Sequence, residues 1–124
     1  MYLCIDSTER NNHHLILVGE NIHKEYISTE PVLLQAIEDF LSAEKISKNL
    51  IQGIGVVVGS GSFSCVRMAV TLANAWHYAL NIRACSLEKK DVENIDRLLF
   101  TLESRLQNNS YILPTYSAPP NIGA

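Results

Sequence analysis

The segment 51–59, IQGIGVVVG, constrains the fold more than any other stretch of this sequence. It is short and rich in β-branched residues, and it contains no charged residue. Such a run is typical of a strand that is covered on both faces. We therefore expect it at the centre of a sheet. The 124 residues of the chain are enough to bury one core around that sheet, in a single domain.

A meander of three strands and a helix are predicted before this central segment. The three strands are YLCID (2–6), HLILVG (14–19) and KEYIS (24–28). Turn-forming residues separate them, which favours antiparallel pairing. Apolar residues then recur three and four positions apart, which predicts a helix over 30–44. Ser28 or Thr29 can cap this helix, and Pro31 is expected in its first turn, where no N–H is needed.

Two helices and a strand are predicted after the central segment. The helix 63–80 contains a single Lys or Arg, Arg67, and so uncharged a helix needs cover on more than one side. The segment 82–86, IRACS, is predicted to be a strand, and 91–107 an amphipathic helix. The inward residues of that last helix are expected to be Val92, Ile95, Leu98, Leu99, Leu102 and Leu106. Residues 108–124 hold three prolines and are expected to form an extended tail.

The predicted order is strand, strand, strand, helix, strand, helix, strand, helix. Three antiparallel strands followed by parallel crossovers are the layout of ribonuclease H-like folds, which include the subdomains of actin-like ATPases. We therefore predict an α/β fold with a five-stranded mixed sheet and flanking helices.

The charge and the cysteines exclude several classes of protein. The formal net charge is -3, which leaves no basic surface for nucleic acid. The sequence has no apolar run of about eighteen residues and no export signal at its start, so we expect a cytoplasmic protein without a membrane span. Cys4, Cys65 and Cys85 are widely spaced among apolar residues. This favours reduced core thiols over disulfides or a zinc site.

The loop Gly59-Ser60-Gly61-Ser62-Phe63 connects the central strand to a helix, where phosphates are often bound. A P-loop needs Lys and then Ser or Thr after its last glycine, and a dinucleotide-binding loop needs a third glycine. Ser62 and Phe63 follow Gly61 here, so neither motif is present. We interpret the loop as a tight turn in which Gly59 and Gly61 permit positive φ and Ser62 caps the helix. An anion site at the helix N-terminus is the alternative.

Asp6, at the end of the first predicted strand, is the other candidate for chemistry. A magnesium site needs further carboxylates around the same ion, and the central segment supplies none. Asp6, followed by Ser7 and Thr8, is expected to organise its own turn through hydrogen bonds to the backbone. His13 and His14 are strand neighbours that point to opposite faces, so they cannot share an ion. We predict no catalytic residue, no cofactor and no metal.

The segment 59–76, GSGSFSCVRMAVTLANAW, is similar to the GPGSFTGLRIG segment of the TsaB family, also called YeaZ, with Arg67 at a matching position. Ser60 stands in place of the family's proline and Cys65 in place of a glycine. The resemblance covers about residues 2–88. Its other parts are CIDSTE (4–9), the helix and central strand (30–59), and IRACSLE (82–88).

Members of that family have two related subdomains. The resemblance implies that residues 1–107 form a single TsaB-like subdomain and that 108–124 form a tail, in which YILPTYSAPPN resembles the family's closing P-x-Y-x-x-P-P segment. With one subdomain there is no cleft between two, so the nucleotide chemistry of the related kinase superfamily is not expected.

The family is the non-catalytic partner in bacterial tRNA threonylcarbamoyladenosine synthesis. The resemblance therefore implies an interaction scaffold without enzymatic activity, and without direct contact to nucleic acid or membrane. Its helices 30–44 and 63–80 would pair with a TsaD-like catalytic protein or with a second copy, as a homodimer. The interface residues expected on these helices are Leu33, Ile37, Val66, Ala69, Val70, Ala73 and Trp76.

Three alternatives remain open at the level of the sequence. In the first, the chain is a remnant that binds a nucleotide or anion at Asp6 and the loop between Gly59 and Gly61. In the second, it is a solitary ribonuclease H-like domain with unrelated partners. In the third alternative the tail 108–124 covers the helical surface and keeps the chain monomeric.

Overall fold

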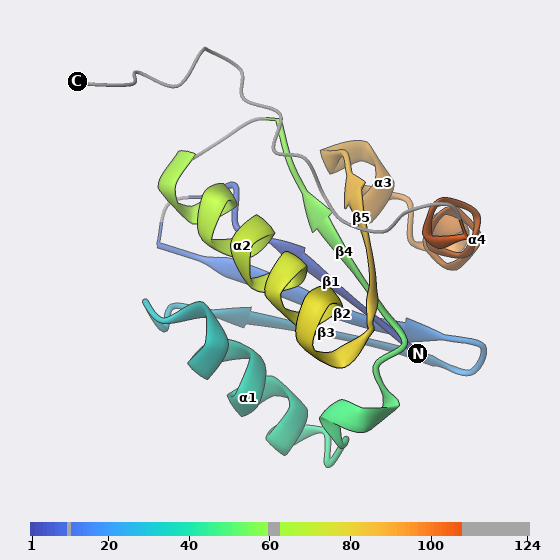
Figure 1. Cartoon of the computed structure of the whole chain (residues 1–124), viewed down its shortest axis with the longest axis horizontal. Coiled ribbons are helices and arrows are strands. Elements are labelled where there is room, and N and C mark those ends of the chain that lie inside the picture. Colours follow the sequence, from blue (N-terminus) through green and yellow to red (C-terminus); the bar gives the residue numbers. More distant parts are fainter. Residues whose placement is uncertain (10, 60–62, 108–124) are drawn as a thin grey trace.

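A five-stranded sheet forms the centre of the computed structural model, which describes residues 1–9, 11–59 and 63–107 (Figure 1). The strands are β1 (Tyr2–Asp6), β2 (His13–Gly19), β3 (Ile22–Ser28), β4 (Gly53–Val57) and β5 (Arg83–Leu87). Their order in the sheet is β3-β2-β1-β4-β5. The first three strands pair antiparallel, and β4 pairs parallel to both β1 and β5. The predicted meander and mixed sheet are confirmed, but β1 is the central strand and β4 lies beside it.

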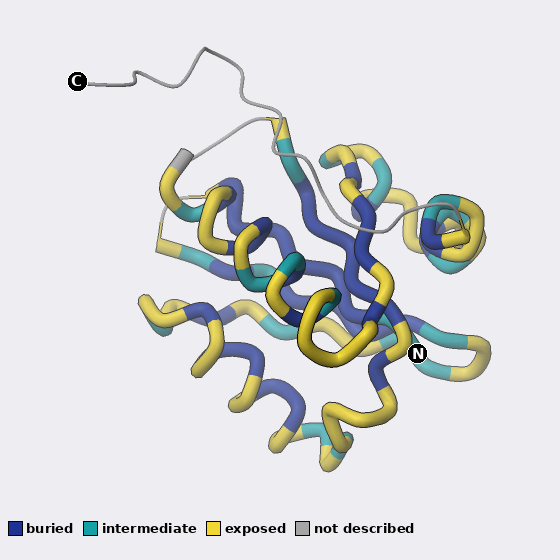
Figure 2. Tube along the Cα trace, in the orientation of Figure 1, coloured by how far each residue is buried: buried dark blue, intermediate teal, exposed yellow. Residues whose placement is uncertain are grey.

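Helices cover both faces of this sheet. The helices are α1 (Leu33–Ala43), α2 (Phe63–Leu80), α3 (Lys89–Glu93) and α4 (Ile95–Leu106), with a 3-10 turn, η1, at Lys48–Leu50. One cluster of buried apolar side chains joins α1 and α2 to the sheet, and a second joins α3 and α4 to the opposite face. Figure 2 shows buried turns facing the sheet and exposed turns facing outward along α1 and α2. The fold is therefore a three-layer α/β/α arrangement.

Gly55 allows α4 to pack closely against the sheet. A Cβ atom at this position would lie 2.6 Å from Cδ1 of Leu87 and 2.9 Å from Cδ2 of Leu102. No side chain fits at those distances without displacing its neighbours. The close approach of α4 therefore requires a glycine at position 55. The central segment is covered on both faces, as its uncharged composition predicts.

The start of α1 differs from the prediction. Its N-cap residue is Val32, and no side chain caps the helix. The hydroxyl of Ser28 instead accepts a hydrogen bond of 3.0 Å from the Glu30 N–H in the preceding turn. Pro31 lies before the helix rather than in its first turn. Ser28 thus bonds to a backbone N–H in its own turn and not to one in the helix, as Ser residues often do.

The predicted helix 91–107 is two helices. Asn94, with φ -100° and ψ 81°, leaves the helical region and separates α3 from α4. Ile95, predicted to point inward, is 46% exposed. The break lets α4 lie along the sheet on its own axis, so that Leu98, Leu102 and Leu106 are buried there. Within the described residues, no helix is both long and apolar enough to cross a membrane.

Candidate functional site

The parallel strands end at one edge of the sheet, where the charged side chain of Asp6 is buried. Its side chain is 2% exposed. One carboxylate oxygen, Oδ1, accepts hydrogen bonds from the Thr8 N–H at 3.0 Å and from the Thr8 hydroxyl at 2.5 Å. The other, Oδ2, accepts from Nζ of Lys89 at 2.5 Å. The predicted turn around Asp6 is confirmed. Sequence reasoning missed the lysine, which is 83 residues away and belongs to the first turn of α3.

The ionisation of this pair follows from its contacts. Burial by itself raises the pKa of Asp6, but the hydrogen bonds from Lys89 and Thr8 outweigh it and hold that pKa below its ordinary value. The hydrogen bond to Asp6 in turn raises the pKa of Lys89. Both groups are thus charged at neutral pH, and each neutralises the other.

Two hollows adjoin this pair. One has a volume of about 140 Å³ and is lined by Asp6, Glu9, Asn12, His14, Ile27 and Lys89. The other has a volume of about 540 Å³ and is lined by Val58, Gly59, Ser86, Leu87, Glu88, Lys89 and Lys90. The lysine ammonium stands against the carboxylate oxygen that a cation would need. Among the residues that the structure describes, no three His, Cys, Asp or Glu side chains are placed to hold one metal ion.

The glycine loop is described only at its two ends. Gly59 has φ +101°, which confirms the positive φ predicted for it, and open space surrounds the position of its absent Cβ. Phe63 begins α2. The predictions for Ser60, Gly61 and Ser62 lie outside the described residues, as does the predicted tail 108–124. The alternative of an anion site at this loop stays a prediction.

The histidines are engaged in hydrogen bonds. Nδ1 of buried His13 lies 2.8 Å from the hydroxyl of Ser7. On the other face of the sheet, the carboxylate of Glu25 binds Nε2 of His14 at 2.7 Å and Nε2 of His23 at 2.9 Å. The hydrogen bond from His23 is the main cause that lowers the pKa of Glu25. His13 and His14 therefore have separate partners, in agreement with their predicted opposite orientation.

The cysteines agree in part with their prediction as core thiols. Cys4 and Cys85 are buried, whereas Cys65, in the first turn of α2, is half-buried. Burial raises the pKa of the Cys4 thiol and raises that of Cys85 to about 11. Both of these thiols are protonated at neutral pH and poor nucleophiles.

The seven residues predicted to form a partner interface are already covered within the chain. They belong to the core cluster beneath α1 and α2, and none is more than 8% exposed: Leu33, Ile37, Val66, Ala69, Val70, Ala73 and Trp76. Their side chains pack against the sheet. The assignment of these seven residues to an interface stays a prediction, as does the pairing of the two helices with a partner.

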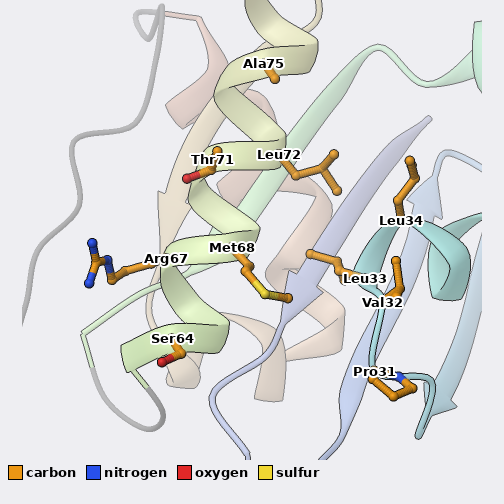
Figure 3. A pocket seen from close by; sticks show the side chains of 10 residues that line it. All are labelled: Pro31, Val32, Leu33, Leu34, Ser64, Arg67, Met68, Thr71, Leu72 and Ala75. Atoms are coloured by element: carbon orange, nitrogen blue, oxygen red, sulfur yellow. The ribbon is translucent and has the colours of Figure 1, made fainter.

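Side chains on and beside the same helices form an open groove, and Leu33 is the one residue of the seven among those that line it (Figure 3). The groove has a volume of about 740 Å³ and runs between the start of α1 and the outer face of α2. Val32, Leu34 and Met68 line it and are 57%, 40% and 43% exposed. Its other lining residues are Pro31, Leu33, Ser64, Arg67, Thr71, Leu72 and Ala75.

The outer face of α2 is built from small and apolar residues at helical spacing. Ser64, Met68, Thr71 and Ala75 follow one another at steps of four, three and four, and all are exposed. Small side chains at such positions let a second helix approach closely. Arg67 is exposed as well, and Figure 3 shows its side chain directed away from α1. The helical period of this stripe was visible in the sequence, but it did not show which face turns outward.

These features define a class of fold. The chain is a ribonuclease H-like, actin-like α/β structure with a five-stranded mixed sheet. It is similar to two solved structures from Pseudomonas aeruginosa: YeaZ itself, and a protein described as uncharacterised with similarity to the peptidase YeaZ. The TM-scores are 0.62 and 0.61, each at 20% sequence identity.

The matched parts are limited in extent. They cover 70% and 71% of this chain but 44% of each solved chain, so this chain spans less than half the length of either structure. No protein-family model and no curated protein sequence matches the chain.

Proposed function

We propose that this chain is a non-catalytic interaction scaffold that binds a helical protein through the groove between α1 and α2. The observation that carries the proposal is the exposure of Val32, Leu34 and Met68 in one open groove. Apolar side chains gathered on a rimmed surface are characteristic of protein contact sites. The uncharged outer stripe of α2 suits a helix as the contacting element.

The biological role in the proposal is support of tRNA threonylcarbamoyladenosine synthesis, with a TsaD-like catalytic protein as the partner and a second copy of this chain as the alternative. The fold shared with YeaZ and the sequence resemblance to the TsaB family over about residues 2–88 support this choice. In this role the chain acts in the cytoplasm and contacts neither the tRNA nor a membrane directly.

The state of Asp6 supports a role without catalysis. Its two carboxylate oxygens are engaged by Thr8 and Lys89. A general base or a metal ligand needs a carboxylate that is available to the substrate or the ion. The alternative of a nucleotide-binding remnant at Asp6 would require the Lys89 contact to break.

A matched pair of substitutions tests the proposed surface. Met68→Asp places a charge in the groove, and we expect it to weaken binding to the TsaD-like protein of the same organism at least about tenfold. Phe100→Asp is the control, since Phe100 is exposed on α4, on the opposite face of the sheet. Titration calorimetry with the purified proteins measures both. Equal binding by the wild type and Met68→Asp would refute the groove as the interface.

A further inference from the structure

The charged side chains of α1, the helix beside the groove, are exposed and acidic. The sequence of α1 contains Glu38 and Asp39 and no Lys or Arg, and both acids are exposed. Glu38 follows the groove residue Leu34 by four positions, so the two are neighbours on the helix surface. Glu30, directly before the groove residues Pro31 and Val32, adds a third acid.

The one charged side chain among the groove-lining residues is basic, and it belongs to the α2 side. Arg67 is the one Lys or Arg in the sequence of α2, and it points away from α1 (Figure 3). The nearest bases after α1 are Lys45 and Lys48, beyond the end of the helix that is distant from Val32 and Leu34. The ammonium of Lys48 lies 5.5 Å from the centre of the Trp76 ring. The groove is thus mainly apolar inside and carries Arg67 on its α2 side, and exposed acids lie on α1 beside it.

We propose that this groove selects a partner whose contact helices carry basic side chains beside an apolar ridge, in preference to a second copy of this chain. The inference rests on the proposed function, because it concerns the same surface. Two copies that met through this face would bring two acidic α1 rims together, and juxtaposed like charges oppose association. A basic partner turns the same rims into attractive contacts and steers the encounter.

A charge-inverted copy of this chain can serve as the basic partner. The variant Glu38→Lys with Asp39→Lys keeps the groove and reverses the charge of its α1 side. In low salt, we expect the wild type to bind this variant at least about tenfold more tightly than it binds itself. The preference should shrink at about 0.5 M salt, since exposed charges are then screened. Sedimentation velocity of each protein alone and of the mixture gives these affinities.

The control for the inverted copy is Asp96→Lys with Glu103→Lys, an equal change of charge on α4, on the opposite face of the sheet. We expect its mixture with the wild type to show no such preference. Equal preference for both variants would mean that net charge alone drives association, and it would overturn the inference. So would wild-type self-association as tight as that of the charge-inverted mixture, or a mixture that stays monomeric at about 100 μM.

Met68→Asp separates this inference from the proposed function. If this substitution abolishes association while charge inversion has no effect, the groove is the interface and the basic partner is refuted. If Met68→Asp leaves every association unchanged, the groove itself fails, and the inference fails with it. If Met68→Asp abolishes association and the wild type prefers the Glu38→Lys, Asp39→Lys variant, the proposed function and the inference of a basic partner are both supported.

Discussion

The edge of the sheet around Asp6 and the groove between α1 and α2 differ in how their side chains are used. At the edge, the buried carboxylate of Asp6 is held by Thr8 and Lys89 beside a hollow of about 140 Å³. In the groove, mainly apolar side chains line about 740 Å³ of open surface, together with Ser64, Arg67 and Thr71. The carboxylate of Asp6 is thus engaged by groups of the chain itself, whereas the apolar side chains Val32, Leu34 and Met68 are exposed. This difference is what supports a binding role over a catalytic one.

The largest loss of stability is expected from a substitution on the face of α1 that packs against the sheet, beneath the groove. Ile37 is fully buried, whereas Leu34 on the same helix is 40% exposed in the groove. Ile37→Ala should lower the free energy of unfolding by about 3 kcal/mol, because it leaves a cavity in the core. Leu34→Ala should cost less than about 1 kcal/mol. Urea denaturation of both variants measures the difference, and similar losses would mean that the groove residues are also part of the core.

A smaller loss is expected at the edge when the Asp6 carboxylate loses its counter-ion. Lys89→Met should lower the free energy of unfolding by about 2 kcal/mol, below the 3–5 kcal/mol of fully buried pairs, because Lys89 is partly exposed. Lys90→Met is the matched control, since Lys90 forms only an exposed pair with Glu88 at 3.5 Å. We expect a loss of less than about 0.5 kcal/mol there. An unchanged denaturation midpoint for Lys89→Met would show that the Lys89–Asp6 pair contributes little to stability.

The same pair gives the stability a defined dependence on pH. The pKa of Asp6 is lowered in the folded chain, so its stabilisation is complete above the ordinary carboxyl pKa of about 4 and is lost as the pH falls through the folded value. The free energy of unfolding of the wild type should therefore fall more steeply in acid than that of Asp6→Asn. Denaturation curves between about pH 6 and pH 2 test this, and parallel pH profiles for the two proteins would contradict it.

The smallest change in stability is expected when a nucleotide is added. Because Lys89 occupies the carboxylate of Asp6, magnesium and ATP should change the melting temperature by less than about 1 °C. A ligand at a hundred times its dissociation constant would add about 2.7 kcal/mol of stability, which thermal melting detects readily. A clear rise in melting temperature that disappears in Asp6→Asn would contradict this prediction and would favour the sheet edge over the groove as the functional site.

Much of the fold was predictable because local patterns record it. The alternation of short apolar segments with turn residues gave the meander, and the uncharged run around Gly55 marked a strand covered on both faces. The boundaries of α2 were also predicted correctly, at residues 63 and 80. The break at Asn94 was not, because the residues of α3 and α4 share one apolar period, and only their packing against the sheet decides where the axis changes.

The sequence by itself determined the type and order of the strands and of α1 and α2, since helical and strand periods are local properties of the chain. Only the tertiary structure decided which face of α2 is buried. Both of its faces lack charge apart from Arg67, so period alone could not separate the Val70 side from the Met68 side. The tertiary structure also brought Lys89 to Asp6 across 83 residues of chain. Such a contact depends on the parallel pairing of β1, β4 and β5, which places the ends of distant strands at one edge of the sheet.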